Sequence, residues 1–399
     1  MIQLSPDARL IFATRALRMV GYGLLSVLLG SYLTALGRSE VEVGAVIATS
    51  VLGGGVLTIA LGHLADRLGR RRTLTACGVI MAATGTVFAL TDRFPILLIV
   101  AATGMVAVTS AEHTPFQALE QAILPQTTGA IERTRLFGWY NLLGSLAWSV
   151  GALASGLAGP LTGILGSQAA AGRALLGLYV GLALIVTALT VRLSPNIELA
   201  PAPALSVVAV PPASRSRIYA LAGLFWLDSF GGGFVVQSLL AYWLTLRFGL
   251  DQTAIGPIFF GTGVLSAVSF LIAVPFAERF GLVNTMVLSQ LPANLCLLLI
   301  PLAPTAPVAV LLLLLRSTLG QMDVPTRQSF TMAIVPPEQR AATAGLMGLA
   351  RNLGQALSPA IAGWALGAAA FGLPFLIAGS LKLAYNAALF FSFRRVKTD

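Results

Sequence analysis

Long apolar runs separated by short polar or charged turns dominate the sequence. Each run is bounded by charged residues, proline or glycine, and is close to the ~20 residues that a helix needs to cross a bilayer. No run shows the alternating period that marks the strands of a membrane β-barrel. The pattern predicts an all-α integral membrane protein with twelve transmembrane helices, at about residues 10–36, 41–63, 73–91, 95–120, 136–159, 173–193, 217–245, 252–277, 282–301, 306–330, 341–366 and 372–393.

One longer stretch of polar and neutral residues divides these runs six and six. Residues 194–216 are rich in proline, a composition that suits a solvated linker. We therefore expect an N-terminal six-helix bundle over residues 1–193 and a C-terminal six-helix bundle over residues 217–399, joined by a cytoplasmic linker over residues 194–216.

The two predicted bundles also resemble each other. Sliding the first half of the chain onto the second pairs Tyr32 with Tyr242, Pro115 with Pro325, Arg133 with Arg340, Gly138 with Gly345 and Gly156 with Gly363, at nearly constant offset. Duplicated bundles that enclose a binding site at their interface are typical of secondary transporters. We therefore expect two pseudo-symmetric halves with a site between them.

The composition supports a membrane protein and excludes a soluble one. Of 399 residues, 56% are hydrophobic and 10% are charged, whereas a soluble domain carries roughly 25% charged residues. The two cysteines, Cys77 and Cys296, lie far apart within apolar runs, and no cluster of histidine, cysteine or methionine could hold a metal. We expect neither a metal nor a cofactor.

Positive charge gathers on one side of the predicted membrane. Assigning alternate turns to alternate sides places eighteen lysines and arginines on one side and four on the other. The positive-inside rule then predicts that both termini are cytoplasmic, in the inner or plasma membrane of the cell. The net charge of +10 therefore matches anionic lipid headgroups, and we expect no nucleic-acid partner.

The turn after the second run carries the most specific motif. It reads Gly62-His63-Leu64-Ala65-Asp66-Arg67-Leu68-Gly69-Arg70-Arg71-Arg72. This resembles the G-x-L-A-D-R-x-G-R-[KR] signature of the major facilitator superfamily, and residues 277–281 resemble a decayed copy. The resemblance implies the major facilitator fold of two six-helix bundles, and a conformational latch that holds the outward-facing state. Its candidate residues are Gly62, Asp66, Arg67, Gly69 and Arg70, with Arg340 as the partner of Asp66 by pseudo-symmetry.

Two further patterns of the superfamily are displaced. The R-x-x-x-G pattern expected on the fourth helix appears in the tenth run, at residues 316–320. The Gly-Pro kink of drug/proton antiporters is missing from the fifth run, and Ser358 and Pro359 open a similar stretch in the eleventh. The chain therefore resembles a twelve-helix drug/proton antiporter with departures from the antiporter pattern.

Ionisable residues deep inside apolar runs are costly and are candidates for function. At a rise of 1.5 Å per residue, Asp228, Arg316, Arg351 and Lys382 lie about 15–18 Å from the predicted cytoplasmic side, near the midplane of the bilayer. Either they form structural ion pairs, or Asp228 is a proton-coupling site beside a substrate cavity. The cavity candidates are Arg316, Arg351, Lys382, Gln237, Gln321, Asn352 and Arg18. For Arg15 and Arg18, lipid-facing anchors are the preferred alternative to cavity cations.

Polar residues end the fourth and tenth runs. They are the candidates for a cytoplasmic gate, in which Glu112 or Glu120 would pair with Arg327 across the two halves; the alternative is that they are solvated helix ends. Asp323 and Glu112 are also proton-coupling candidates. The gate candidates are Glu112, His113, Glu120, Asp323 and Arg327.

The sequence favours gradient-driven transport over catalysis. It holds no G-x-x-x-x-G-K nucleotide loop and no recognisable set of catalytic residues, so we expect no enzyme. Mainly from the family resemblance, we expect a monomeric, proton-coupled exporter of small organic compounds. Two alternatives stay open: an importer or exchanger of organic or inorganic anions, and a lipid-handling or receptor-like protein that does not concentrate its ligand.

Overall fold

A computed structural model describes residues 5–106, 114–124, 133–198, 212–334 and 340–394 of the chain. These residues form helices joined by turns, with no β-strand among them, so the all-α prediction is confirmed. The first half contains α1 (Pro6–Ala35), α2 (Glu40–Leu68), α3 (Arg70–Leu90), α4 (Phe94–Ala101), α5 (Pro115–Ile123), α6 (Arg133–Ala154), α7 (Ala158–Leu165) and α8 (Gln168–Val191). The second half contains α9 (Pro212–Gly233), α10 (Gln237–Phe248), α11 (Gln252–Phe280), α12 (Leu282–Leu299), α13 (Ala306–Leu319), α14 (Asp323–Ala333), α15 (Arg340–Gly367) and α16 (Leu373–Phe393).

Ten segments of the described chain are long and apolar enough to cross a membrane. The predicted continuous helix over residues 95–120 is wrong, because α4 ends at Ala101 and the described residues 102–106 are not helical; the next described helix begins at Pro115. Proline suits a helix start, since it lacks the N–H that a helix interior needs. The predicted span 341–366 coincides with α15, which is not among these ten segments. Its interior carries the polar residues Arg351, Asn352 and Gln355. Twelve spans in two groups of six remain consistent with this arrangement.

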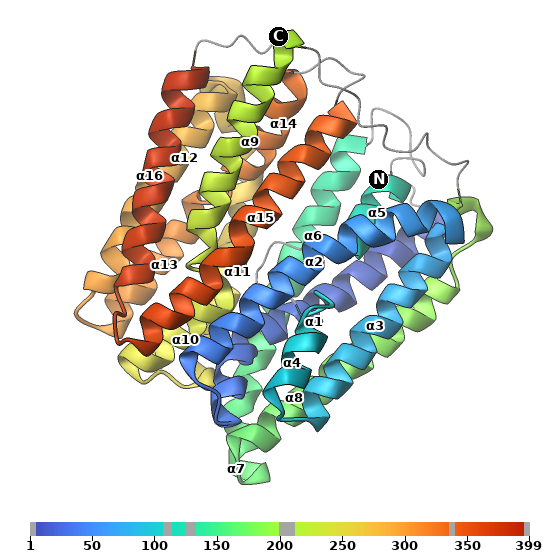
Figure 1. Ribbon diagram of the computed structural model, residues 1–399, viewed down its shortest axis with the longest axis vertical. Coiled ribbons are helices and arrows are strands. Elements are labelled where there is room, and N and C mark those ends of the chain that lie inside the picture. Colours follow the sequence, from blue (N-terminus) through green and yellow to red (C-terminus); the bar gives the residue numbers. More distant parts are fainter. Residues whose placement is uncertain (1–4, 107–113, 125–132, 199–211, 335–339, 395–399) are drawn as a thin grey trace.

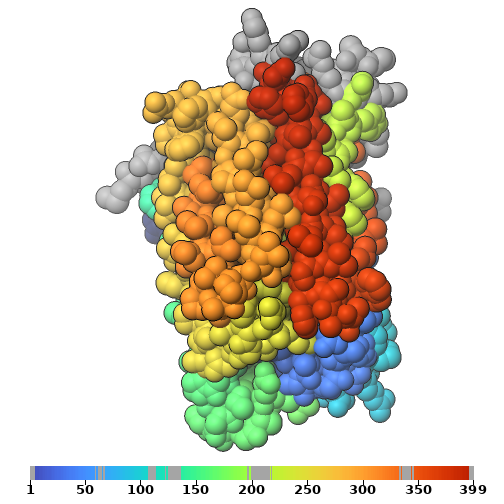
Figure 2. All heavy atoms as spheres, turned by 90° about the vertical axis from the view of Figure 1, so that its left-hand side faces the viewer, coloured from blue at the N-terminus to red at the C-terminus, as the bar shows by residue number. Residues whose placement is uncertain are grey.

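The two halves lie side by side. Figure 1 shows α1–α8 on one side and α9–α16 on the other, with the start of α1 and the end of α16 toward the same end of the molecule. Within the halves, α3 packs on α8, α1 on α6, α15 on α9 and α12 on α16; the last pair runs along the face shown in Figure 2. The halves meet mainly through α2 with α15, α6 with α11 and α1 with α10.

Glycine allows the halves to approach closely between α2 and α15. A Cβ atom added at Gly44 would lie 2.9 Å from the Cα of Gly363, and one added at Gly363 would lie 2.8 Å from the Cα of Gly44. Small residues permit such close backbone packing between helices in membranes.

Hydrogen bonds also join the halves at the end opposite the start of α1. They involve the last third of α1, the first residue of α2 and the α10–α11 region. The Ser238 hydroxyl donates to the Ser26 carbonyl (2.7 Å), the Gln252 amide donates to the Ser31 hydroxyl (2.8 Å), and the Tyr242 hydroxyl donates to a Glu40 carboxylate oxygen (3.2 Å). In this conformation the halves are therefore held together at that end.

Candidate functional site

A buried carboxylate on α9 contacts cations from two other helices. Asp228 is 7% exposed. Its carboxylate accepts from the Lys382 ammonium of α16 at 2.6 Å and from the Arg327 guanidinium of α14 at 3.3 Å. Arg327 also pairs with Asp323, one turn earlier on α14, at 3.0 Å. The charges thus form a connected cluster inside the second half.

A third cation adjoins this cluster. The Arg351 guanidinium of α15 reaches the hydroxyl of Ser229, next to Asp228, at 3.4 Å and interacts electrostatically with Arg327 and Asp228. Three cations, Arg327, Arg351 and Lys382, therefore face two carboxylates, Asp228 and Asp323. We call these five side chains the second-half cluster; its formal charge is +1.

Glycines of α9 bring Lys382 into the bundle. A Cβ added at Gly231 would lie 3.3 Å from the Cγ of Lys382, and one added at Gly232 would lie 3.7 Å from its Cε. The long side chain therefore lies along the glycine face of α9, and its ammonium reaches Asp228. One turn after Lys382, the buried amide of Asn386 has no hydrogen-bond partner in the described part of the chain.

A second cluster lies in the first half. Arg18 of α1, which is 0% exposed, donates to both carboxylate oxygens of Glu120 on α5, at 3.0 and 2.8 Å. The Tyr140 hydroxyl of α6 donates to Glu120 at 2.5 Å and accepts from Arg15 at 2.9 Å. We call Arg15, Arg18, Glu120 and Tyr140 the first-half cluster. The preferred interpretation of both arginines as lipid-facing anchors is wrong, because both are buried in this cluster.

The two clusters occupy related positions with opposite polarity. Asp228 follows Arg18 at the same offset along the chain that relates Tyr32 to Tyr242. When Pro115 is aligned with Pro325, Arg327 matches Gln117 and therefore lies about one turn before the counterpart of Glu120. Arginine on α1 with glutamate on α5 is therefore matched by aspartate on α9 with arginine on α14. The sequence analysis missed this relation, because the repeat offset pairs Arg18 with Asp228 but leaves their partners one helical turn apart.

The predicted pair of Glu120 with Arg327 across the halves is not formed in this structure. Glu120 pairs with Arg18 of its own half, and Arg327 pairs with Asp228 and Asp323 of its own half. The alternative of solvated helix ends is wrong for these residues, since Glu120, Asp323 and Arg327 are all buried. The remaining gate and coupling candidates, Glu112 and His113, lie outside the described residues.

The other cavity candidates are more scattered. Asn352 lies on α15 where it faces α2, since a Cβ added at Gly55 would lie 3.4 Å from the Cβ of Asn352. Arg316 is half-buried on α13, and no ion pair joins it to Asp228 in the described part of the chain. Gln237 begins α10, and Gln321 follows α13; both are half-buried.

The structure describes only some residues of the predicted latch. Gly69 separates α2 from α3 with φ of +93°, a left-handed conformation that glycine adopts without strain. The backbone N–H groups of Arg70 and Arg71, which follow, donate to the Glu198 carboxylate at 2.5 and 3.0 Å. Gly62, Asp66, Arg67 and Arg340 belong to α2 and α15, but their side chains lie outside the described part of the structure. The Asp66–Arg340 contact therefore stays a prediction.

Solved structures share this fold at low sequence identity. A crystal structure of a variant of the nucleoside transporter NupG matches with a TM-score of 0.79 at 17% identity, covering 97% of this chain and 100% of that chain. The D-xylose-proton symporter matches with a TM-score of 0.74 at 16% identity, covering 97% of each chain. The human organic anion transporter MFSD10 (TETRAN) matches with a TM-score of 0.63 at 20% identity, covering 96% of this chain and 100% of that chain.

Sequence comparison covers nearly all of the chain. A relative from Saccharomyces cerevisiae, the uncharacterized membrane protein YJR124C, is 26% identical over 421 residues that cover 96% of this chain and 93% of the relative. The sequence model of the Major Facilitator Superfamily matches residues 11–321 and 221–399 of this chain. The resemblance that the motif at residues 62–72 suggested is therefore confirmed, and the chain belongs to the Major Facilitator Superfamily of membrane transporters.

Proposed function

We propose that this transporter is proton-coupled and exports small organic compounds, with Asp228 as its proton-binding carboxylate. The observation that carries the proposal is the contact of this buried carboxylate with Lys382 and Arg327 from two other helices. Cations at this distance stabilise a charged carboxylate, whereas burial without them stabilises the protonated form. A rearrangement that separates Asp228 from its cations therefore favours proton uptake.

The packing of the halves supports alternating access. The halves are held together at one end by Gly44 against Gly363 and by hydrogen bonds such as that between Gln252 and Ser31. Rocking about the central clusters would open this end and close the other. Binding of a proton or substrate shifts such an equilibrium only if it favours one of the two states. The export direction rests on the resemblance to drug/proton antiporters.

The excess of positive charge favours a second candidate, the transport or exchange of organic anions. Among the described residues, the second-half cluster carries three cations against two carboxylates. A substrate anion would compensate this excess. The fold shared with a human organic anion transporter is consistent with this candidate.

Replacement of Asp228 tests the proton coupling. In proteoliposomes, Asp228→Asn should abolish substrate accumulation driven by a pH gradient and keep some substrate binding, because the amide preserves the shape but takes up no proton. Asp251→Asn is the matched control, since Asp251 caps the start of α11 and asparagine caps a helix equally well. Full coupling in the Asp228→Asn variant would refute the assignment of Asp228 as the proton-binding carboxylate.

The substrate class is tested separately. Transport of a cationic dye and of an organic anion should be compared with and without a pH gradient. Dye transport that depends on the gradient supports the exporter, whereas anion transport supports the second candidate. Arg316→Ala and Arg351→Ala should weaken anion binding far more than dye transport.

A further inference from the structure

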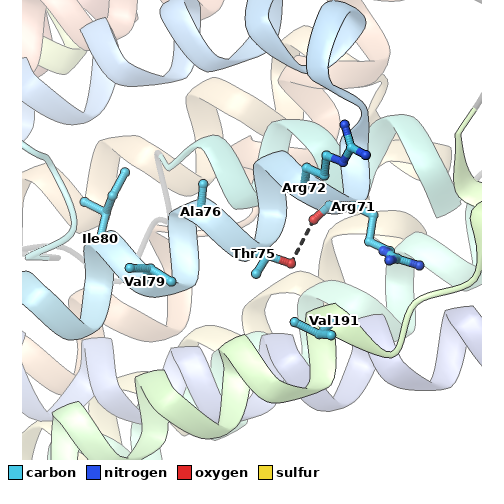
Figure 3. Close-up of a pocket in the computed structure, with 7 residues that line it drawn as sticks. All are labelled: Arg71, Arg72, Thr75, Ala76, Val79, Ile80 and Val191. Atoms are coloured by element: carbon cyan, nitrogen blue, oxygen red, sulfur yellow. Dashed lines mark hydrogen bonds between the residues drawn. The ribbon is translucent and has the colours of Figure 1, made fainter.

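A groove runs along the outer face of the first half, between α3 and the end of α8 (Figure 3). Its volume is about 540 Å³. Two arginines lie at one end, and the rest of the lining is apolar apart from one threonine. The lining residues are Arg71, Arg72, Thr75, Ala76, Val79, Ile80 and Val191.

The apolar part of the groove faces away from the other half. The main contacts of α3 and α8 are with helices of the first half. Val79 is 54% exposed and Val191 is 53% exposed, and both lie in candidate membrane-spanning segments. Ile80 lies eight positions after Arg72, about 12 Å along the helix. The groove therefore offers an apolar track along the helices, with positive charge at the end where α3 begins.

The arginine side chains, rather than the start of the helix, supply this charge. The backbone N–H groups of Arg70 and Arg71 are already bound to Glu198. The Arg71 guanidinium donates to the Leu193 carbonyl at 3.3 Å. The Arg72 guanidinium is exposed, and the described part of the chain offers it no hydrogen-bond or ion-pair partner.

The second half contains the same turn without these charges. Gly281 precedes α12 with φ of +80°, as Gly69 precedes α3 with φ of +93°. When these two glycines are aligned, however, Val283 and Asn284 occupy the places of Arg71 and Arg72. The turn itself therefore does not require two arginines at these positions.

We propose that an anionic phospholipid binds in this groove of the transporter. Its phosphate contacts Arg71 and Arg72, and an acyl chain lies along Ala76, Val79, Ile80 and Val191. The groove matches this ligand because it joins positive charge to an apolar track, and because the positive-inside count places α3's first turn in the anionic leaflet. The site is separate from both buried charge clusters and does not depend on the transported substrate.

Quenching of an introduced tryptophan by brominated lipids tests the site. The Val79→Trp reporter lies in the groove, and the Leu291→Trp reporter is its match in the second half when Gly69 is aligned with Gly281. The full chain with each reporter is placed in phosphatidylcholine nanodiscs that contain an increasing share of brominated phosphatidylglycerol. The signal of the chain without a reporter is subtracted, because five native tryptophans are present. Half-maximal quenching at Val79→Trp should need a share of phosphatidylglycerol that is lower by about fivefold or more than at Leu291→Trp.

Charge variants identify the cause. Adding Arg71→Gln and Arg72→Gln to the Val79→Trp reporter should remove the preference, whereas Arg71→Lys with Arg72→Lys should keep most of it. If the double glutamine variant does not fold, Arg72→Gln alone should reduce the preference, since Arg72 has no partner to lose in the described part of the chain. The proposal would be overturned if brominated phosphatidylglycerol quenched the two reporters equally. It would also be overturned if brominated phosphatidylcholine gave the same difference between the reporters, or if the difference persisted after the arginines were replaced.

Discussion

Replacing only one member of the buried ion pair between Arg18 and Glu120 should strongly destabilise the folded protein. Arg18→Ala leaves a buried carboxylate without its main cation, which costs about 3–5 kcal/mol. The paired replacement Arg18→Leu with Glu120→Leu removes both charges and should recover most of this loss. Thermal unfolding of the purified protein in detergent measures the difference. If the single variant is as stable as the double variant, Glu120 is compensated by other groups, such as Tyr140.

At the residue scale, the sequence identifies buried charge better than it identifies partners. Asp228 and Lys382 could be located because a charge inside an apolar run is rare and depth follows from the rise per residue. The same count placed the end of the fourth run at the membrane edge, but it assumed one continuous helix. The break after Ala101 invalidates that count, so the burial of Glu120 could not be predicted. Its contact with Arg18 spans 102 residues, which no local pattern specifies.

At the scale of helices, the contact of α2 with α15 should depend on the absence of a side chain at Gly363. A Cβ there would lie 2.6 Å from the Glu40 carbonyl oxygen, and a backbone atom cannot move away without shifting its helix. Gly363→Ala should therefore push the two helices apart. A cysteine at Ser31 should then react faster with a membrane-impermeant maleimide. Unchanged reactivity would show that the helices adjust locally without separating.

Gly348→Ala is the control for this variant. It adds the same methyl group to the same helix at a position with no atom within 4 Å of the new Cβ. Alanine is also the better helix former, so this variant should be as stable as the parent or slightly more stable. The packing of α15 against α2 could not be predicted from the pattern of either helix alone. The sequence shows how long the apolar part of a helix is, but it does not show which helix packs against it.

For the whole molecule, the repeat in the sequence is the most informative feature. The repeat relates Gly69 to Gly281, and the structure gives both glycines a positive φ before a helix. The repeat also relates Arg18 to Asp228, and these two residues form buried ion pairs of opposite polarity, Arg18 with Glu120 and Asp228 with Arg327. The first helix of each half therefore carries a buried charge at the same repeat position, and the sign of that charge differs. This is why the architecture could be predicted from the sequence while the chemistry of the first half could not.

If the halves rock as bodies, a link between them should stop transport, and a link within one half should not. On a background without Cys77 and Cys296, Ser31→Cys with Gln252→Cys joins the halves, because these side chains are hydrogen-bonded at 2.8 Å. Thr84→Cys with Thr103→Cys is the matched pair within the first half, whose hydroxyls lie 3.0 Å apart. A short bifunctional methanethiosulfonate should abolish substrate transport in proteoliposomes only for the first pair, and a reducing agent should restore it. The linked protein should still bind substrate, because the link holds the conformation seen here. Undiminished transport by the first pair after complete linking would mean that the end joined by Ser31 and Gln252 does not open during the cycle.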